Sequence, residues 1–185
     1  YTCGPTVYRE IHIGNLRTYL TTDLIRRALM RNDYEVKSVM NITDVGHMRY
    51  STDANRQIDP ILYEAEQKKM SPLELSRYYT KHFFEDTQKL NMQPHDVIPL
   101  ATEYIPEMIE IIKILIKKKY AYETQGNVYF NVKKFKDYGK LSGNTLDKMD
   151  KLLEAVRVSV ETDKKDSIDF ALWKKADANH LMQWD

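Results

Sequence analysis

Three residues near the start of the chain have side chains that could bind a nucleotide or a metal ion: Cys3, His12 and Asn15. The first residues are of β type, Gly4 begins a turn, and an amphipathic helix follows Asn15. A strand, a loop and a helix N-terminus in this order present backbone N–H groups to phosphate. Gly14 allows a ligand to approach the backbone closely, and His12 and Asn15 can point to one side of the first turn.

A helix and a second strand must position these groups. The apolar spacing predicts a helix over 16–30 and a strand over 35–43, which together with the first residues form a βαβ unit with parallel strands and a right-handed crossover. Thr43 and Asp44 follow the second strand. In parallel sheets, ligands bind beyond the carboxyl ends of the strands, so we expect these residues and His12 to meet at one crevice. Thr43 could equally be an ordinary β-branched strand residue, and the charge of Asp44 suits an ammonium group.

Composition restricts the class of protein. A chain of 185 residues can form one sizeable core, or one domain with a smaller insertion. The net charge of +1 provides no overall basic field for nucleic acid, and the lysine runs read as solvated surface. The single cysteine excludes an internal disulfide and fits a reducing compartment. Charged residues interrupt the longest apolar patch, so we expect no membrane span and a cytoplasmic location.

Helix signals continue along the chain. A helix is expected over 60–69, and Ser71-Pro72-Leu73-Glu74 is a capping box with proline at the first helical position, which predicts a helix to about residue 90. The segment 91–99 contains two prolines and reads as a linker.

The last third of the chain mixes helix and strand signals. A helix is expected over 102–119, with a hairpin of strands at 120–123 and 127–132 around Thr124-Gln125-Gly126, and a short helix over 146–156. The expected buried stripe of the first of these helices is Ile105, Met108, Ile109, Ile112, Leu115 and Ile116.

Five segments, in order, resemble the cysteinyl-tRNA synthetases, a family of class I aminoacyl-tRNA synthetases. The opening C-G-P-T-V-Y and H-I-G-N are similar to the family's start, with H-I-G-N a variant of the H-I-G-H signature. The other similar segments are Met40–His47 with N-I-T-D, Gly126–Phe130, Tyr138–Ser142 and Asp169–Lys174. The resemblance covers essentially the whole chain, which corresponds to the front part of a family member.

The resemblance implies a role for each site residue. His12 and Asn15 are the expected catalytic residues, and with Thr6 and Gly14 they would bind ATP. Gly4 and Thr43 would bind cysteine. Cys3 would be a ligand of one zinc ion that holds the substrate sulfur, with the remaining ligands (a cysteine, a histidine and a glutamate) outside this chain. Asn15 departs from the signature's second histidine, and its amide can donate to phosphate but carries no charge.

The implied fold is α/β, with a Rossmann-like parallel sheet and an inserted α+β connective-peptide subdomain. We expect residues 1–98 to form the first half of the catalytic domain, 99–168 the connective peptide, and 169–185 the return to the catalytic domain. Lys69-Met70-Ser71 is similar to the family's second nucleotide loop, K-M-S-K-S, but Ser71 is explained by the helix cap, and that loop lies later in family members.

The resemblance implies a cysteine–tRNA ligase, with L-cysteine, ATP with magnesium and tRNA(Cys) as partners, and a monomer. This stretch alone is expected to be inactive. Two other interpretations stay open. One is a related ligase that joins cysteine to an amino-sugar, as the mycothiol ligases do. The other is an inactive fragment or paralogue that acts as a binding module.

Overall fold

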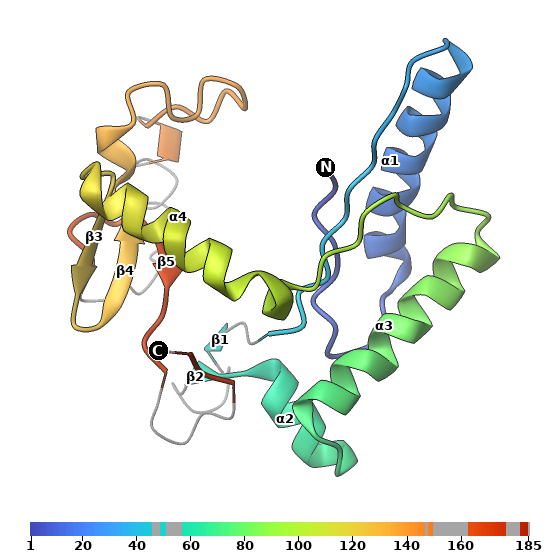
Figure 1. The fold of residues 1–185 in the computed structure, drawn as a ribbon, viewed down its shortest axis with the longest axis horizontal. Coiled ribbons are helices and arrows are strands. Elements are labelled where there is room, and N and C mark those ends of the chain that lie inside the picture. The colour runs from blue at the N-terminus through green and yellow to red at the C-terminus, as the bar shows by residue number, and fades with distance from the viewer. Residues whose placement is uncertain (46–48, 51–56, 147, 150–162, 177–181, 185) are drawn as a thin grey trace. The chain divides into compact units, whose positions relative to one another are not determined.

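The computed structural model describes residues 1–45, 49–50, 57–146, 148–149, 163–176 and 182–184, and the short helix expected over 146–156 lies largely outside them. The chain forms two compact units, Tyr1–Ile105 and Pro106–Asp185, each described by itself. The first contains α1 (Ile13–Arg31), β1 (Arg49–Tyr50), β2 (Gln57–Ile58), α2 (Pro60–Lys68), α3 (Pro72–Lys89) and the 3₁₀ turn η1 (Ala101–Tyr104) (Figure 1). The second contains most of α4 (Ile105–Lys117), then β3 (Ala121–Thr124), β4 (Asn127–Phe130), the 3₁₀ turn η2 (Val132–Lys134) and β5 (Phe170–Trp173).

Three extended segments lie side by side in the first unit. Parallel bridges join Thr2 to Met40 and Thr6 to Thr43, and further parallel bridges join 39 to 97 and 42 to 100. The segment 38–43 therefore lies between 2–7 and 96–101. This confirms the parallel pairing expected for the ends of the first βαβ unit.

The third extended segment is a correction to the expected linker over 91–99. The Pro99 carbonyl oxygen accepts from the Ile42 amide at 2.9 Å, and the Val97 carbonyl oxygen accepts from the Met40 amide at 3.1 Å. Proline is tolerated here because only its carbonyl faces the neighbouring segment, so its missing N–H leaves these hydrogen bonds intact. The compact units divide after Ile105, seven residues beyond the boundary expected at 98.

The helices of the first unit begin at capping side chains. The capping box predicted for α3 is confirmed, since Ser71 Oγ accepts from the Glu74 amide at 3.2 Å and Glu74 Oε2 accepts from the Ser71 amide at 2.8 Å. Asp59 Oδ1 accepts from the Ile61 amide at 2.8 Å at the start of α2. The first helix starts three residues earlier than expected, at Ile13, because His12 supplies its cap.

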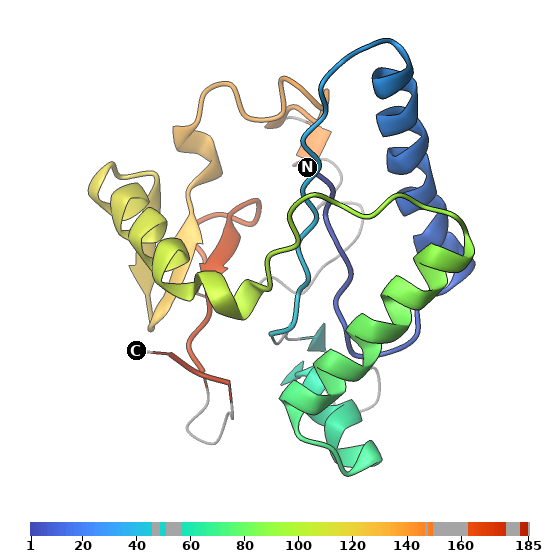
Figure 2. The ribbon, with the colours of Figure 1, turned by 45° about the vertical axis from the view of Figure 1, so that its right-hand side comes forward.

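The buried core of the first unit joins the extended segments to the helices. Both ribbon views show α1 and α3 together on one side of these segments (Figures 1 and 2). The rings of Tyr19 on α1 and Phe83 on α3 meet edge to face, with centroids 5.2 Å apart. The buried side chains of this core are Val7, Tyr19, Met40, Ile42, Ile61, Ala65, Leu75, Tyr79 and Phe83.

The second unit is built on the hairpin that the sequence predicts. β3 pairs antiparallel with β4 around Gln125 and Gly126, both of which have positive φ. β5 then pairs antiparallel with the other edge of β4. Phe170–Trp173 therefore lies, by its pairing, in the second unit. The three-part division of the chain stays a prediction.

The stripe expected on α4 is less buried than its pattern suggests. Of its six residues, Ile105 is buried, Ile109, Ile112 and Leu115 are half-buried, and Met108 and Ile116 are exposed. Ile111 and Ile114, which lie outside this stripe, are also exposed, so α4 carries apolar residues on more than one side. Within the part of the chain that is described, no helix combines the length and the apolar character needed to cross a membrane.

Candidate functional site

The start of α1 brings His12 and Asn15 into reciprocal contact. His12 Nδ1 accepts from the Gly14 amide at 3.1 Å, and Asn15 Oδ1 accepts from the His12 amide at 3.4 Å. With Nδ1 acting as acceptor, the hydrogen of the neutral ring lies on Nε2. The two acceptor atoms face the backbone, so Nε2 of His12 and Nδ2 of Asn15 are the groups that can donate outwards. Both side chains are exposed, and the positive end of the helix dipole adds to their attraction for an anion.

Gly14 has a steric role beside these donors. A Cβ on Gly14 would lie 2.9 Å from Cε1 and 3.0 Å from Nδ1 of His12. Any larger residue would therefore displace the imidazole. The absence of a side chain at this position leaves room for the ring in the orientation set by the Gly14 amide, in addition to allowing a ligand to approach the backbone.

The amide of Asn41 links the two residues expected to bind cysteine. Asn41 Oδ1 accepts from the Gly4 amide at 2.9 Å and from the Tyr1 hydroxyl at 2.8 Å, while Asn41 Nδ2 donates to Thr43 Oγ1 at 3.1 Å. Gly4 packs directly on this segment, since a Cβ there would lie 1.6 Å from the Asn41 carbonyl oxygen. Gly4 and Thr43 are thus held close together by one side chain.

The first two extended segments carry the expected residues to the same end. Thr6 and Thr43 form a parallel bridge, and the Thr43 amide donates to the Pro5 carbonyl oxygen at 2.9 Å. The Val7 amide returns a hydrogen bond to the Thr43 carbonyl oxygen at 3.2 Å. Thr43 therefore lies beside the part of the chain that leads to His12, as expected for two motifs that meet at the carboxyl ends of parallel strands.

Cys3 is an exposed free thiol. Burial, and then the negative charge that a Cys3 thiolate carries, raise the pKa of the Tyr19 hydroxyl on α1, and the same two causes raise the pKa of the Tyr1 hydroxyl. A zinc ion needs about four ligands. Within the described residues, no group of three or more His, Cys, Asp and Glu side chains could hold a metal, so these residues do not form a zinc site by themselves.

Asp44 is not available for an ammonium group. Its side chain is only 3% exposed. Oδ1 accepts from the Thr102 amide at 3.0 Å, and Oδ2 accepts from the Thr102 hydroxyl at 2.6 Å. The Asp44 carboxylate therefore fastens the end of the second extended segment to η1, and the expected role in binding an ammonium group is replaced by a structural one.

Two contacts of the site were missed by sequence reasoning. Asn41 belongs to the N-I-T-D segment but was given no role, although its place two residues before Thr43 puts both side chains on one face of a strand. Glu10 Oε1 lies 2.6 Å from His82 Nδ1 of α3, which fixes the loop just before His12. No local pattern indicates this second pair, because its partners are 72 positions apart.

Comparison with known proteins identifies the family of the chain. The family model described as "tRNA synthetases class I (C) catalytic domain" matches residues 1–185. A cysteine–tRNA ligase of Chlorobium luteolum is 45% identical over 185 residues, and that of Thermus thermophilus is 42% identical over 184 residues. Each match covers all of this chain but only 38% and 37% of the relative, respectively. Since the family match spans the whole chain and the relatives exceed 40% identity, the chain belongs to the class I (C) tRNA synthetase catalytic domains.

Proposed function

We propose that the full-length protein is a cysteine–tRNA ligase. It joins L-cysteine to ATP with magnesium, giving cysteinyl-adenylate and pyrophosphate, and then transfers the cysteinyl group to the terminal ribose of tRNA(Cys). The observation that carries the proposal is the reciprocal cap of His12 and Asn15, whose remaining donors point away from the helix in a chain of this family.

His12 and Asn15 act on the phosphates in this proposal. Negative charge builds up on the α-phosphate as the cysteine carboxylate attacks it. Donors that are already oriented stabilise this charge more in the transition state than in the ground state. The carboxylate is ionised at neutral pH, so the step needs no general base. Gly14 holds the imidazole in place, and Thr6 completes the ATP-binding set.

Gly4 and Thr43 recognise cysteine in this proposal. Because Thr43 Oγ1 accepts from Asn41 Nδ2, its own hydrogen can be donated to a substrate atom. Gly4 keeps the first segment close enough to 41 for this arrangement. Cys3 is proposed as one ligand of a zinc ion whose other ligands come from outside the described residues. When bound, zinc would favour a thiolate over a hydroxyl and so distinguish cysteine from serine.

The finer architecture is part of the same proposal. The parallel bridges between 2–7, 38–43 and 96–101 support a Rossmann-like sheet. The separate compact unit with its own antiparallel sheet supports a connective-peptide insertion after residue 98, with the division near 105 as the structural boundary.

The test is pyrophosphate exchange by the full-length protein, dependent on both cysteine and ATP, followed by charging of tRNA(Cys). We expect His12→Ala to lower the exchange rate by about 10²-fold to 10³-fold, as expected for loss of one preorganised donor. The matched control is His95→Ala, which changes a histidine remote from the α1 cap. Exchange without tRNA charging would favour a different acceptor, and no exchange in the presence of zinc and magnesium would refute the proposal.

A further inference from the structure

The helix α3 contacts the chain on both sides of the His12 cap. Nδ1 of His82 lies 2.6 Å from Oε1 of Glu10, which is two residues before the cap. The next residue of α3, Phe83, meets the ring of Tyr19 on α1 edge to face, at 5.2 Å between ring centroids. One turn of α3 therefore holds the chain at a point before His12 and at a point after it.

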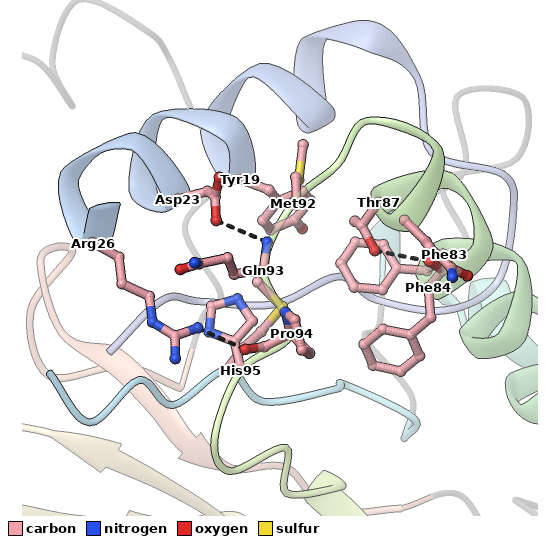
Figure 3. A pocket seen from close by; sticks show the side chains of 12 residues that line it. Tyr19, Asp23, Arg26, Phe83, Phe84, Thr87, Met92, Gln93, Pro94 and His95 are labelled. Carbon is pink, nitrogen blue, oxygen red and sulfur yellow. Dashed lines mark hydrogen bonds between the residues drawn. The ribbon is translucent and has the colours of Figure 1, made fainter. Parts of the chain in front are cut away.

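The contact between Tyr19 and Phe83 fixes a point on α1 but not the direction of its first turns. Both rings line a pocket of about 360 Å³ between α1, α3 and the segment 92–95, so this contact is not enclosed by packing on every side (Figure 3). Tyr19 lies seven residues after His12, roughly 10 Å along the helix axis. A tilt of about 6° at Tyr19 would therefore move the cap by about 1 Å. Displacements of this size can slow a reaction strongly when they misplace a group that acts in the transition state.

The imidazole of His82 is itself held in place on α3. Its ring centroid lies 4.1 Å from that of Tyr78, and the buried ring of Tyr79 meets it edge to face at 6.4 Å. A carboxylate can only accept, so Nδ1 of His82 carries the hydrogen and donates it to Glu10. The side chains of His82 and Glu10 are 31% and 54% exposed, so the pair contributes little to overall stability. Its effect is expected instead in the position of the loop that it holds.

The same helix is joined to the other half of the proposed site. Ser76 is 2% exposed, and its Oγ donates to the carbonyl oxygen of Asp44 at 3.3 Å. Asp44 directly follows Thr43. Since Ser76 is six residues before His82, roughly 9 Å along α3, this helix connects the segment that carries Thr43 to the loop that precedes His12.

On the basis of the proposed function, we propose that His82 is a positioning residue for the activation of cysteine. It acts through Glu10, whose contact with Nδ1 sets where the His12 cap lies relative to Thr43. Loss of this contact lets the first turns of α1 tilt about Tyr19. Because the donors of the cap act in the transition state, we expect the kcat of exchange to fall while the KM for cysteine stays unchanged.

The test measures cysteine-dependent pyrophosphate exchange by the full-length protein. We expect His82→Ala to lower kcat about threefold to tenfold and to change the KM for cysteine less than about twofold. His82→Asn places an amide donor near the position of Nδ1, so it should restore kcat to within about twofold. Glu10→Ala should match His82→Ala. Lys81→Ala, which removes an exposed ion pair with Glu85 on the same helix, is the matched control and should leave kcat unchanged.

A double-mutant cycle decides whether His82 acts through His12. In the His12→Ala background, His82→Ala should lower kcat by a smaller factor than in the unaltered protein, because the donor that it positions is gone. An unchanged kcat in His82→Ala, the same factor in both backgrounds, or no recovery in His82→Asn would overturn the proposal. Thermal unfolding checks that each variant is folded, and if His82→Ala is not folded, Glu10→Ala replaces it in the cycle.

Loss of the positioning role and loss of the proposed function give different results. Absence of exchange in the unaltered protein would refute the proposed function, whereas normal exchange that His82→Ala leaves unchanged would refute only the role of His82. A second readout does not depend on activity. In protein with ¹³C-labelled histidine, His12→Ala identifies the NMR signal of the His12 Cε1–H group. We expect His82→Ala to displace this signal and His82→Asn and Lys81→Ala to leave it in place, and an unmoved signal in His82→Ala would contradict the positioning role.

Discussion

At the scale of single residues, the orientation of the Thr43 hydroxyl depends on Asn41. One face of the Asn41 amide accepts from Gly4 and Tyr1, and the other donates to Thr43. An asparagine is suited to this place because it has both an acceptor and a donor, whereas aspartate would present only acceptors to the Thr43 oxygen. Asn41 is therefore a positioning residue for the proposed cysteine site.

We expect Asn41→Ala in the full-length protein to raise the KM for cysteine about fivefold to tenfold in the exchange assay, with a smaller effect on the KM for ATP. The reason is that loss of one oriented hydrogen bond corresponds to about 1 kcal/mol. Asn32→Ala, which removes a side-chain hydrogen bond to the Ala28 carbonyl oxygen at the far end of α1, is the matched control. An unchanged KM for cysteine would show that Asn41 has only a structural role.

The sequence predicts which residues gather at the site better than it predicts how they are held. His12, Gly14 and Asn15 are expected together at a helix start, and the structure adds that their acceptor atoms form the cap. The role expected of Asp44 is wrong, since its carboxylate is hydrogen-bonded to Thr102. The sequence does not reveal this bond, because Thr102 is 58 positions away and no local pattern indicates a buried carboxylate. Long-range partners of polar residues are set by tertiary packing, so single-sequence patterns do not reveal them.

At the scale of elements, the start of α3 tests how much a cap contributes. Ser71 and Glu74 satisfy each other's backbone amides. We expect Ser71→Ala to lower the free energy of unfolding by about 1 kcal/mol and Ser71→Thr, which keeps the hydroxyl as acceptor and as donor to Glu74, to change it by less than about 0.5 kcal/mol. Chemical denaturation measures both. Equal losses in the two variants would mean that the cap is not the cause.

The Ser71 backbone amide, and then the Ser71 hydroxyl, lower the pKa of the Glu74 carboxyl. The charged form is therefore favoured in the folded state, and its contribution to stability is present above the carboxyl's ordinary pKa and lost as pH falls through the lowered one. We expect the free energy of unfolding of Glu74→Gln, measured by chemical denaturation at several pH values, to lack the loss that Glu74 causes as pH falls.

Tyr122, in the sheet of the second unit, makes the stability of the folded state depend on pH in the alkaline range. Burial, with help from the Asp169 carboxylate that accepts its hydroxyl at 2.7 Å, raises the pKa of Tyr122 to about 12. The folded state then holds this proton more tightly than the unfolded state, whose ordinary value is about 10. Stability from this group is therefore full below about pH 10 and lost between about pH 10 and 12.

We expect the thermal midpoint of unfolding to fall less steeply across this alkaline window in Tyr122→Phe than in the unaltered chain. The reason is that phenylalanine has no proton to lose. Tyr63→Phe, an exposed tyrosine of α2, is the control and should keep the slope of the unaltered chain. Identical slopes for all three proteins would remove Tyr122 as the group responsible.

Elements with a local signal are the ones that the sequence predicts well. The capping box of α3 and the turn between β3 and β4 depend on residues a few positions apart. The extended segment at 96–101 was missed because Pro94 and Pro99 suggest a linker, while its pairing with 38–43 is a long-range property. The pairing of β5 with β4 was not expected for the same reason, since β4 is distant from it in the sequence.

At the scale of the whole molecule, the chain spans 38% of the length of relatives such as the Chlorobium luteolum ligase. We expect the 185-residue chain by itself to show no cysteine-dependent pyrophosphate exchange, because the family resemblance places a second nucleotide loop and further zinc ligands outside it. The full-length protein assayed in parallel is the control. Exchange by the short chain would show that its own residues suffice for activation.

The division of the chain after Ile105 affects how it can fold during synthesis. All three parallel segments of the first unit lie within its first 101 residues, so this unit can begin to pack as soon as that stretch has left the ribosomal exit tunnel. The sheet of the second unit is completed only with β5, because one edge of β4 stays unpaired until Phe170–Trp173 has been synthesised. A pause in translation between these two points would leave a nascent chain with one packed half and one half open to chaperones.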